Sequence, residues 1–361
     1  MIPVADPRRA VEARRDEIDT AIASVLDGGR YIFGPEHEAL EHDLAAYLNV
    51  PHCVGLANGT DALEIALKAV DCRDGDEIVT AANAGFYTSS AAVAAGLSVR
   101  YADVEPSTLV LSADTVAPSL TPATRAVVVT HLYGLLADVE SIVELCHARE
   151  IAVVEDCAQA AGARRGGRMA GSFGDAATFS FYPTKNLAAL GDAGAIVTRD
   201  ETIAARARAA RQYGWRTKYQ VASPGRNSRL DELQAAILRV RLPHLDRDNA
   251  RRRAIVARYA SALRPEAGRL VVRDAEDCVC HLAVAVVEQR DRAHASLRAA
   301  DIATDVHYPV PDHRQALWGD RFAQLELPTT EHACDHVLTL PCFPELRDDE
   351  VDRVCEALAE L

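Results

Sequence analysis

The chain has 361 residues, of which 39 are lysine or arginine and 53 are aspartate or glutamate, so its formal net charge at pH 7 is −14. This surplus of acids argues against nonspecific binding to nucleic acid or to an anionic membrane. The length exceeds the size at which one hydrophobic core keeps growing, which predicts a large domain and a smaller one.

The N-terminal residues and the cysteines indicate the cellular compartment. Residues 1–6 lack a charged segment followed by an apolar one, and no segment approaches the roughly 20 apolar residues of a membrane span. The nine cysteines show no repeated zinc spacing, and Cys278, Cys280 and His281 fall in an alternating, strand-like run. We therefore expect buried free thiols, no metal site and a cytoplasmic protein.

Apolar, β-branched runs alternate with helical patterns through the first two thirds of the chain, at residues 77–80, 98–101, 126–130, 151–154 and 195–198. Near-continuous apolar strands between helices predict a mostly parallel sheet covered on both faces. Ligands of such sheets bind at the carboxyl ends of the strands, where Asp156 and the segment after Thr130 would lie.

A long helical passage is predicted over residues 231–263, with Pro243 bending or interrupting it. It would link a large domain, residues 1–245, to a small C-terminal domain, residues 246–361. Shorter strands such as 281–287 between amphipathic helices indicate that the small domain is α+β. The predicted fold class is therefore α/β, with a mostly parallel sheet in the large domain.

One lysine lies in surroundings that suit chemistry better than solvation. Lys185 is set in Ser-Phe-Tyr-Pro-Thr-Lys-Asn-Leu, and a buried strand upstream ends in Asp156, with Gln159 three residues further on. Partial burial would lower the pKa of Lys185, which could then form a Schiff base. The acid could hold a pyridine nitrogen protonated and the amide could bond a phenolic oxygen, although Asp156 could also be a structural cap. Together these residues predict pyridoxal phosphate.

A second pattern suits the phosphate of that cofactor. Gly59 and Thr60 open an amphipathic helix, where free backbone N–H groups and a hydroxyl can hold a phosphate, although an ordinary helix cap has the same pattern. Ser180 could donate its hydroxyl to the same phosphate or could be a strand serine satisfied by backbone.

Three further segments fit either a structural or a functional role. Residues 225–230 suit a loop with a capping serine. His307 and Tyr308 suit either a proline-restrained turn or a substrate site, and His131 is as compatible with a structural role as with a functional one.

Five segments, in order along the chain, carry a resemblance to a known family: residues 59–63, 131–134, 155–159, 180–187 and 225–234. By these motifs nearly the whole chain resembles the DegT/DnrJ/EryC1/StrS sugar aminotransferases. The resemblance implies a fold type I, aspartate aminotransferase-like homodimer that uses pyridoxal phosphate to aminate a nucleotide-linked keto sugar.

The resemblance also implies roles for single residues at the cofactor. Lys185 would form the Schiff base and move the proton, Asp156 would pair with the pyridine nitrogen, and Gln159 would lie near the phenolic oxygen. Three residues would hold the phosphate: Gly59, Thr60 and Ser180.

Other matched positions concern the partner subunit and the substrate. Asn227 would reach the phosphate of the neighbouring subunit's cofactor, so each dimer would share its active sites. His307 and Tyr308 match a segment that lines the sugar-nucleotide cleft, and Arg229 and Tyr213 would lie at its mouth.

The sequence departs from the family pattern at one position. Many members carry an aromatic residue that stacks on the cofactor where this chain has Gly85. Either Phe86 or Tyr87 would take over the stacking through a shifted backbone, or something smaller would cover the ring.

The resemblance implies a two-stage exchange. An amino donor, glutamate by family analogy, would convert the cofactor to pyridoxamine phosphate, which would then aminate the ketone of the sugar. Residues 211–219 resemble members that act on dTDP-3-keto-6-deoxyhexoses in the biosynthesis of antibiotic amino-deoxysugars. A 4-keto sugar or a keto-inositol stays open as the acceptor.

Two other functions exist within the family. Sugar dehydratases of this type carry histidine in place of the lysine, so Lys185 argues against that reaction. A non-catalytic, cofactor-binding regulator is the second alternative, and no DNA-binding appendage or basic arm supports it.

Overall fold

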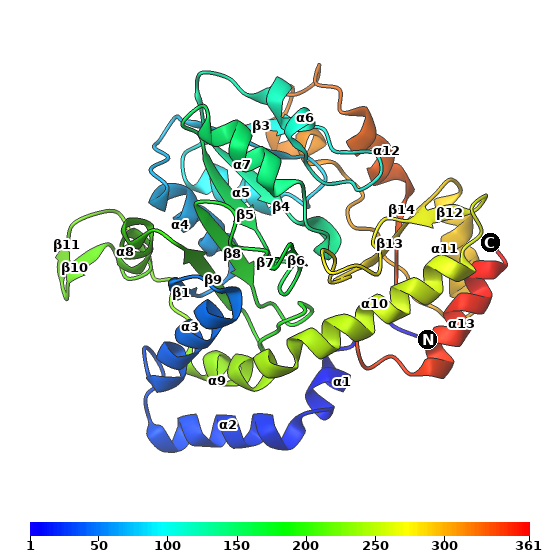
Figure 1. Ribbon diagram of the computed structural model, residues 1–361, viewed down its shortest axis with the longest axis horizontal. Coiled ribbons are helices and arrows are strands. Elements are labelled where there is room, and N and C mark those ends of the chain that lie inside the picture. The colour runs from blue at the N-terminus through cyan, green and yellow to red at the C-terminus, as the bar shows by residue number, and fades with distance from the viewer.

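The computed structural model describes residues 1–361. Its centre is a seven-stranded sheet in the order β1-β9-β8-β5-β4-β2-β3 (Figure 1). Its strands are β1 His52–Leu56, β2 Glu77–Ala81, β3 Ser98–Ala102, β4 Thr124–Thr130, β5 Ala152–Asp156, β8 Ala176–Ser180 and β9 Gly194–Thr198. Strand β9 is antiparallel to both neighbours, and the remaining pairs are parallel. The predicted mostly parallel α/β sheet is confirmed.

Alternate residues of the central strands pack into two separate cores. In β4, Val127 and Val129 belong to one buried cluster, whereas Ala126 and Val128 belong to another. Side chains of a strand alternate between its faces, so this division means that both faces of the sheet are covered. Helices α4, α5 and α8 lie over one face, and the larger cluster on the other face continues into the C-terminal helices.

The helices run between and after these strands. They are α1 Pro7–Glu12, α2 Arg15–Gly28, α3 Pro35–Leu48, α4 Gly59–Ala69, α5 Tyr87–Ala94, α6 Ala113–Val116, α7 Val139–His147, α8 Glu201–Ala210, α9 Glu232–Arg241, α10 Leu245–Ala262, α11 Arg290–Ala299, α12 Pro328–His336 and α13 Asp348–Ala359. None of them combines the length and the apolar character that crossing a bilayer requires. Two small hairpins are β6 Arg164–Arg165 with β7 Arg168–Met169, and β10 Trp215–Thr217 with β11 Gln220–Val221.

The long helical passage is present and is interrupted where Pro243 predicts. A 3₁₀ turn at Leu242–His244 separates α9 from α10, because proline lacks the N–H that a continuous helix needs. After α10 the chain forms a three-stranded antiparallel sheet, β12 Gly268–Leu270, β13 Ala283–Val287 and β14 Val337–Leu340. The strand expected at 281–287 begins only at Ala283, because the backbone still bends at His281 and Leu282, directly after the left-handed Cys280 (φ 47°).

The strands of the seven-stranded sheet precede residue 245 in the chain, and those of the three-stranded sheet follow it. The domain boundary placed at residue 245 remains a prediction. The first residues of the chain nevertheless pair with its last third. Ile2 forms a parallel bridge with Ile302, and the Cys342 N–H donates to the Val4 carbonyl at 3.2 Å. Figure 1 accordingly shows the N-terminus close to α13.

Candidate functional site

A cavity of about 650 Å³ is lined by the ends of the sheet strands, the start of α4 and residues of the C-terminal third. The sequence-predicted residues that line it are Gly59, Thr60, Tyr87, Asp156, Gln159, Ser180, Lys185, His307 and Tyr308. Asp156 and Ser180 end adjacent parallel strands, so the topology brings them to one edge of the sheet. The structure therefore joins most of the predicted site in one place.

Lys185 lies in the turn that follows β8, where its N–H donates to the Tyr182 carbonyl at 2.8 Å. Burial lowers the pKa of Lys185 to about 8, and the negative charge of Asp156 partly opposes this shift. A pKa of this size leaves a useful fraction of the amine neutral near pH 8. Lys185 is therefore suited to act as a nucleophile and as a proton carrier.

Asp156 ends β5 and is 5% exposed. Its carboxylate accepts hydrogen bonds from the Ala158 N–H at 3.1 Å and the Thr130 hydroxyl at 3.4 Å. Burial raises the pKa of Asp156 in spite of these bonds and of the charge on Lys185. A buried acid of this kind fits a cationic ring nitrogen, because the cation would stabilise the buried carboxylate in place of the hydration that an exposed carboxylate receives.

The side-chain amide of Gln159 has a fixed orientation. Its Oε1 accepts the Tyr133 N–H at 2.6 Å, and its Nε2 donates to the Tyr308 hydroxyl at 3.3 Å. The NH₂ group of the Gln159 amide therefore faces the cavity, where it can donate to an oxygen of a ligand.

The start of α4 fits a phosphate. Asn58 caps the helix by accepting the Asp61 N–H at 2.8 Å, which leaves the first amides of the helix available. A Cβ on Gly59 would lie 2.7 Å from the Cβ of Ser180, so only glycine lets the helix approach β8 this closely. The acid, the lysine and this helix start together fit pyridoxal phosphate.

Four predicted residues lie outside this cavity. The ring of Phe86 packs against Trp318, with centroids 5.8 Å apart. Tyr213, Asn227 and Arg229 flank the β10–β11 hairpin, which projects from the body of the molecule in Figure 1. Asn227 is exposed and pairs with Gln212, and the Arg229 guanidinium lies 6.0 Å from the Tyr213 ring centre.

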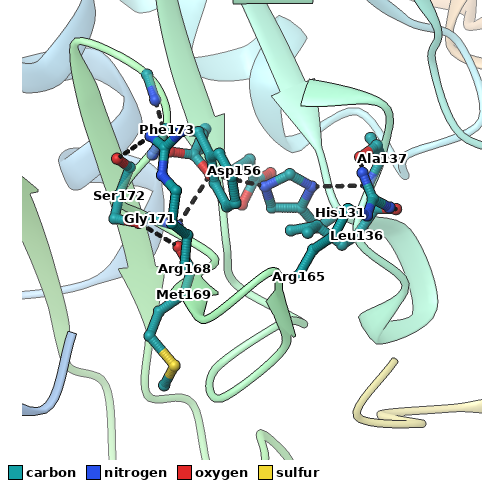
Figure 2. A network of polar contacts seen from close by, with 12 residues as sticks. His131, Leu136, Ala137, Asp156, Arg165, Arg168, Met169, Gly171, Ser172 and Phe173 are labelled. Atoms are coloured by element: carbon teal, nitrogen blue, oxygen red, sulfur yellow. Dashed lines mark hydrogen bonds and ion pairs between the residues drawn. The ribbon is translucent and has the colours of Figure 1, made fainter. Parts of the chain in front are cut away.

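The sequence left the role of His131 open and gave Glu155 no role, and the structure joins them in a buried network. Both side chains are fully buried, and His131 Nε2 lies 3.0 Å from Glu155 Oε2. His131 Nδ1 accepts the Ala137 N–H at 3.1 Å, so Nε2 carries the proton and donates it to the carboxylate. In Figure 2, His131 lies between Ala137 and the loop that carries Gly171 and Phe173.

Glu155 fastens that loop to the sheet. Its two oxygens also accept the N–H groups of Gly171 at 2.9 Å, Phe173 at 2.7 Å and Gly174 at 2.8 Å. Burial alone would raise the pKa of Glu155, but His131 and these amides hold it below its usual value. The ligand atoms of His131, Glu155 and Cys157 lie within 4.8 Å of one another, yet both nitrogens of His131 are already used. The group is therefore a structural network outside the cavity lining, and its only trace in the sequence was an acid next to Asp156 in an apolar run, which did not reveal its partners.

Comparisons with known proteins agree with this site. A model of the DegT/DnrJ/EryC1/StrS aminotransferase family matches residues 12–359. The dTDP-3-amino-3,4,6-trideoxy-alpha-D-glucose transaminase of Streptomyces venezuelae is 42% identical over an alignment of 365 positions, which covers 99% of this chain and 96% of that protein. A pleiotropic regulatory protein of Geobacillus stearothermophilus is 39% identical over an alignment of 364 positions, which covers 99% of this chain and 98% of that protein.

Solved structures give the same result. The crystal structure of S. venezuelae DesV in complex with a ketimine intermediate matches with a TM-score of 0.96 at 42% identity, covering 99% of this chain and 98% of that chain. NtdA of Bacillus subtilis, with the cofactor PMP bound, matches with a TM-score of 0.90 at 32% identity, covering 96% and 82% of the two chains. The chain thus belongs to the DegT/DnrJ/EryC1/StrS aminotransferase family and is a pyridoxal phosphate-dependent transaminase.

Proposed function

We propose that this transaminase moves an amino group from glutamate to a nucleotide-linked keto sugar, with a dTDP-3-keto-6-deoxyhexose as the leading acceptor. The observation that carries the proposal is the single cavity in which Lys185 and Asp156 lie together with His307 and Tyr308. The 42% identity to a transaminase named for a dTDP-linked 3-amino sugar supports the choice of acceptor. The products would be 2-oxoglutarate and a 3-amino sugar.

Each residue of the cavity has a distinct part in this reaction. Bound pyridoxal phosphate supplies an electron sink for the carbanion that forms when a proton leaves carbon. Lys185 Nζ takes the proton from the α-carbon of the donor and, in the second half-reaction, delivers a proton to the sugar carbon that receives the amine. Its pKa of about 8 keeps both forms accessible.

The remaining residues would hold and orient the cofactor and the substrate. The Asp156 carboxylate would keep the pyridine nitrogen protonated, and Gln159 Nε2 would donate to the phenolic oxygen. Gly59, Thr60 and Ser180 would bind the phosphate. His307 would contact the sugar nucleotide, and Tyr308 lies beside it in the cavity.

We also propose a homodimer with shared active sites. Asn227 is exposed at the base of the β10–β11 hairpin, where it pairs with Gln212, and it does not line the cavity of its own subunit, which supports its reaching the phosphate site of a partner. Tyr213 and Arg229 would enter the mouth of the partner's cavity with it. A cytoplasmic location is consistent with nine free cysteines, of which only Cys355 is not buried.

The first experiment is an absorbance spectrum of the purified protein with pyridoxal phosphate, before and after addition of glutamate. We expect the visible band of the lysine-bound cofactor to give way to the spectrum of pyridoxamine phosphate. Keto sugars linked to dTDP or UDP, 4-keto sugars and keto-inositols are then compared as acceptors. A band that does not change when glutamate is added would refute glutamate as the donor. Turnover of only a 4-keto sugar or only a keto-inositol would refute the proposed acceptor in favour of that compound.

Two variants test the residues. Lys185→Ala should remain folded, lose the visible band and lose amine transfer, and full retained activity would refute the role of Lys185. Mixing Lys185→Ala with Asn227→Ala subunits should restore roughly a quarter of wild-type activity, because half of randomly paired dimers contain one intact site. No recovery on mixing, with each variant still dimeric, would contradict shared sites.

A further inference from the structure

The loop between β2 and α5 leaves a gap that another part of the chain fills. Gly85 has a left-handed backbone (φ +81°), and a Cβ placed on it would lie 2.7 Å from Cζ and 2.8 Å from Cε1 of Tyr308. The ring of Tyr308 therefore lies directly against the Gly85 backbone. A side chain at position 85 and the ring of Tyr308 would compete for the same space.

Hydrogen bonds fasten the segment that carries Tyr308 to this loop. The Asp312 N–H donates to the Ala82 carbonyl at 2.7 Å, and the Asp312 carboxylate accepts the Phe86 N–H at 2.9 Å and the Ser89 hydroxyl at 3.3 Å. Asp312 is 1% exposed, so these bonds are shielded from water. The contact between Tyr308 and Gly85 is thus built into the fold.

The same loop turns its own aromatic residues elsewhere. Phe86 also has a left-handed backbone (φ 70°), and its ring packs on Trp318 outside the cavity. Tyr87 lines the cavity, but it is 51% exposed and meets Tyr308 edge-on, at 6.1 Å and 73°. Of the three residues, only Tyr308 both lines the cavity and is partly buried.

Tyr308 also touches the residue assigned to the phenolic oxygen. Its hydroxyl accepts Gln159 Nε2 at 3.3 Å, and the preceding His307 carbonyl accepts the Tyr133 hydroxyl at 2.6 Å. Burial raises the pKa of Tyr308, so the hydroxyl stays protonated at all working pH values. Gly85 and Gln159 therefore both fix the hydroxyl end of the ring, Gly85 by contact with Cζ and Cε1 and Gln159 by a hydrogen bond to the hydroxyl.

We propose that Tyr308, and neither Phe86 nor Tyr87, is the aromatic residue that covers the pyridine ring of the cofactor. Gly85 is required because any side chain at this position would occupy the space of the Tyr308 ring. A side chain from the C-terminal third thereby takes over a task that the loop after β2 performs in many relatives. The inference rests on the assignment of Asp156 and Gln159 to the cofactor ring.

The test measures pyridoxal phosphate binding by Tyr308→Leu and Tyr308→Phe, using the dissociation constant and the circular dichroism that the protein induces in the visible band. Stacking energies of aromatic pairs correspond to about a twofold to twelvefold change in affinity. We therefore expect Tyr308→Leu to bind about two to twelve times more weakly with an altered visible dichroism, whereas Tyr308→Phe, which keeps the ring, retains both. Wild-type binding shows separately that the cofactor site itself exists.

Gly85→Ala is a second test that keeps Tyr308, so it serves even if Tyr308→Leu unfolds. It should weaken binding by displacing the Tyr308 ring, and wild-type affinity and dichroism in folded Gly85→Ala would overturn the proposal. If Tyr308→Leu folds, Gly85→Ala should have a smaller effect in that background, because residues in contact are not additive. Wild-type affinity and dichroism in folded Tyr308→Leu would overturn the proposal. A loss of both in Phe86→Leu or Tyr87→Leu that exceeds the loss in Tyr308→Leu would also overturn it.

Discussion

Replacing Glu155 by glutamine should destabilise the folded protein far more than its small change in shape suggests. Oε1 accepts two backbone N–H groups, those of Phe173 and Gly174. Oε2 accepts the N–H of Gly171 and the Nε2–H of His131. Glutamine has only one oxygen, so in either orientation its NH₂ group faces two donors. His131 cannot relieve this by moving its proton, because Nδ1 is engaged by the Ala137 N–H.

The magnitude follows from those two stranded donors. A buried donor without a partner costs about 1–3 kcal/mol, so two cost about 2–6 kcal/mol. Glu155 and His131 are both 0% exposed, so water cannot compensate. Since whole proteins are stable by about 5–15 kcal/mol, this loss is a large fraction of the total.

Urea unfolding of the apo protein, followed by circular dichroism at fixed protein concentration, measures this change. Glu144→Gln is the matched control, because Glu144 is exposed on the surface of α7 and should change stability by less than about 0.5 kcal/mol. Acidification adds a second check. The pKa of Glu155 is lowered by folding, so its stabilisation is lost as the pH falls through the folded-state pKa, and the variant should lack this dependence. A Glu155→Gln protein as stable as wild type would refute the reasoning.

Three further predictions concern the cavity and its surroundings. Asp156→Asn removes the charge that raises the pKa of Lys185, so this pKa should fall below about 8 in the apo protein. The pH dependence of lysine methylation measures it. An unchanged or higher pKa would contradict the pairing of Asp156 with Lys185. Burial raises the pKa of Asp312 to about 7, so the folded state holds this proton more tightly than the unfolded state does. The stability that this group contributes should therefore fall by about 3 kcal/mol as the pH rises from 4 to 7. Asp312→Asn should abolish that slope in pH-dependent urea unfolding, and an identical slope would show that another group causes it. Gly59→Ala should weaken pyridoxal phosphate binding about tenfold or more in an absorbance titration, because its Cβ would lie 2.7 Å from the Cβ of Ser180; equal affinity would mean that the helix start shifts freely.

The fold was predictable where burial leaves a continuous pattern in the sequence. The apolar run at 126–130 is buried on both faces and is recognisable as a strand. Strand β1 contains Gly55 and β8 contains small alanines, so neither has a β-branched run, and neither was predicted. The antiparallel direction of β9 was also inaccessible, because a strand buried on both faces has the same apolar pattern in either direction.

The site was predictable where strand ends determine position. Asp156 directly follows a buried run, and topology alone takes it to the binding edge. The direction of Phe86 was not predictable, since it depends on Asp312 and Trp318, more than 200 residues later in the chain. The role of Glu155 was hidden for a related reason: most of its partners are backbone amides, which have no signature in a sequence.

The first residues of the chain form part of the cavity wall and are hydrogen-bonded to residues near the other end of the chain. Val4 and Ala5 line the cavity. The Val4 carbonyl is held by the Cys342 N–H, and the Arg9 guanidinium forms two hydrogen bonds to Glu350, at 2.7 and 2.8 Å. Any rotation of the three-stranded sheet against the seven-stranded one would therefore carry this wall with it. One wall of the cavity is thus a segment that belongs to neither sheet and is joined by hydrogen bonds to the C-terminal part of the chain.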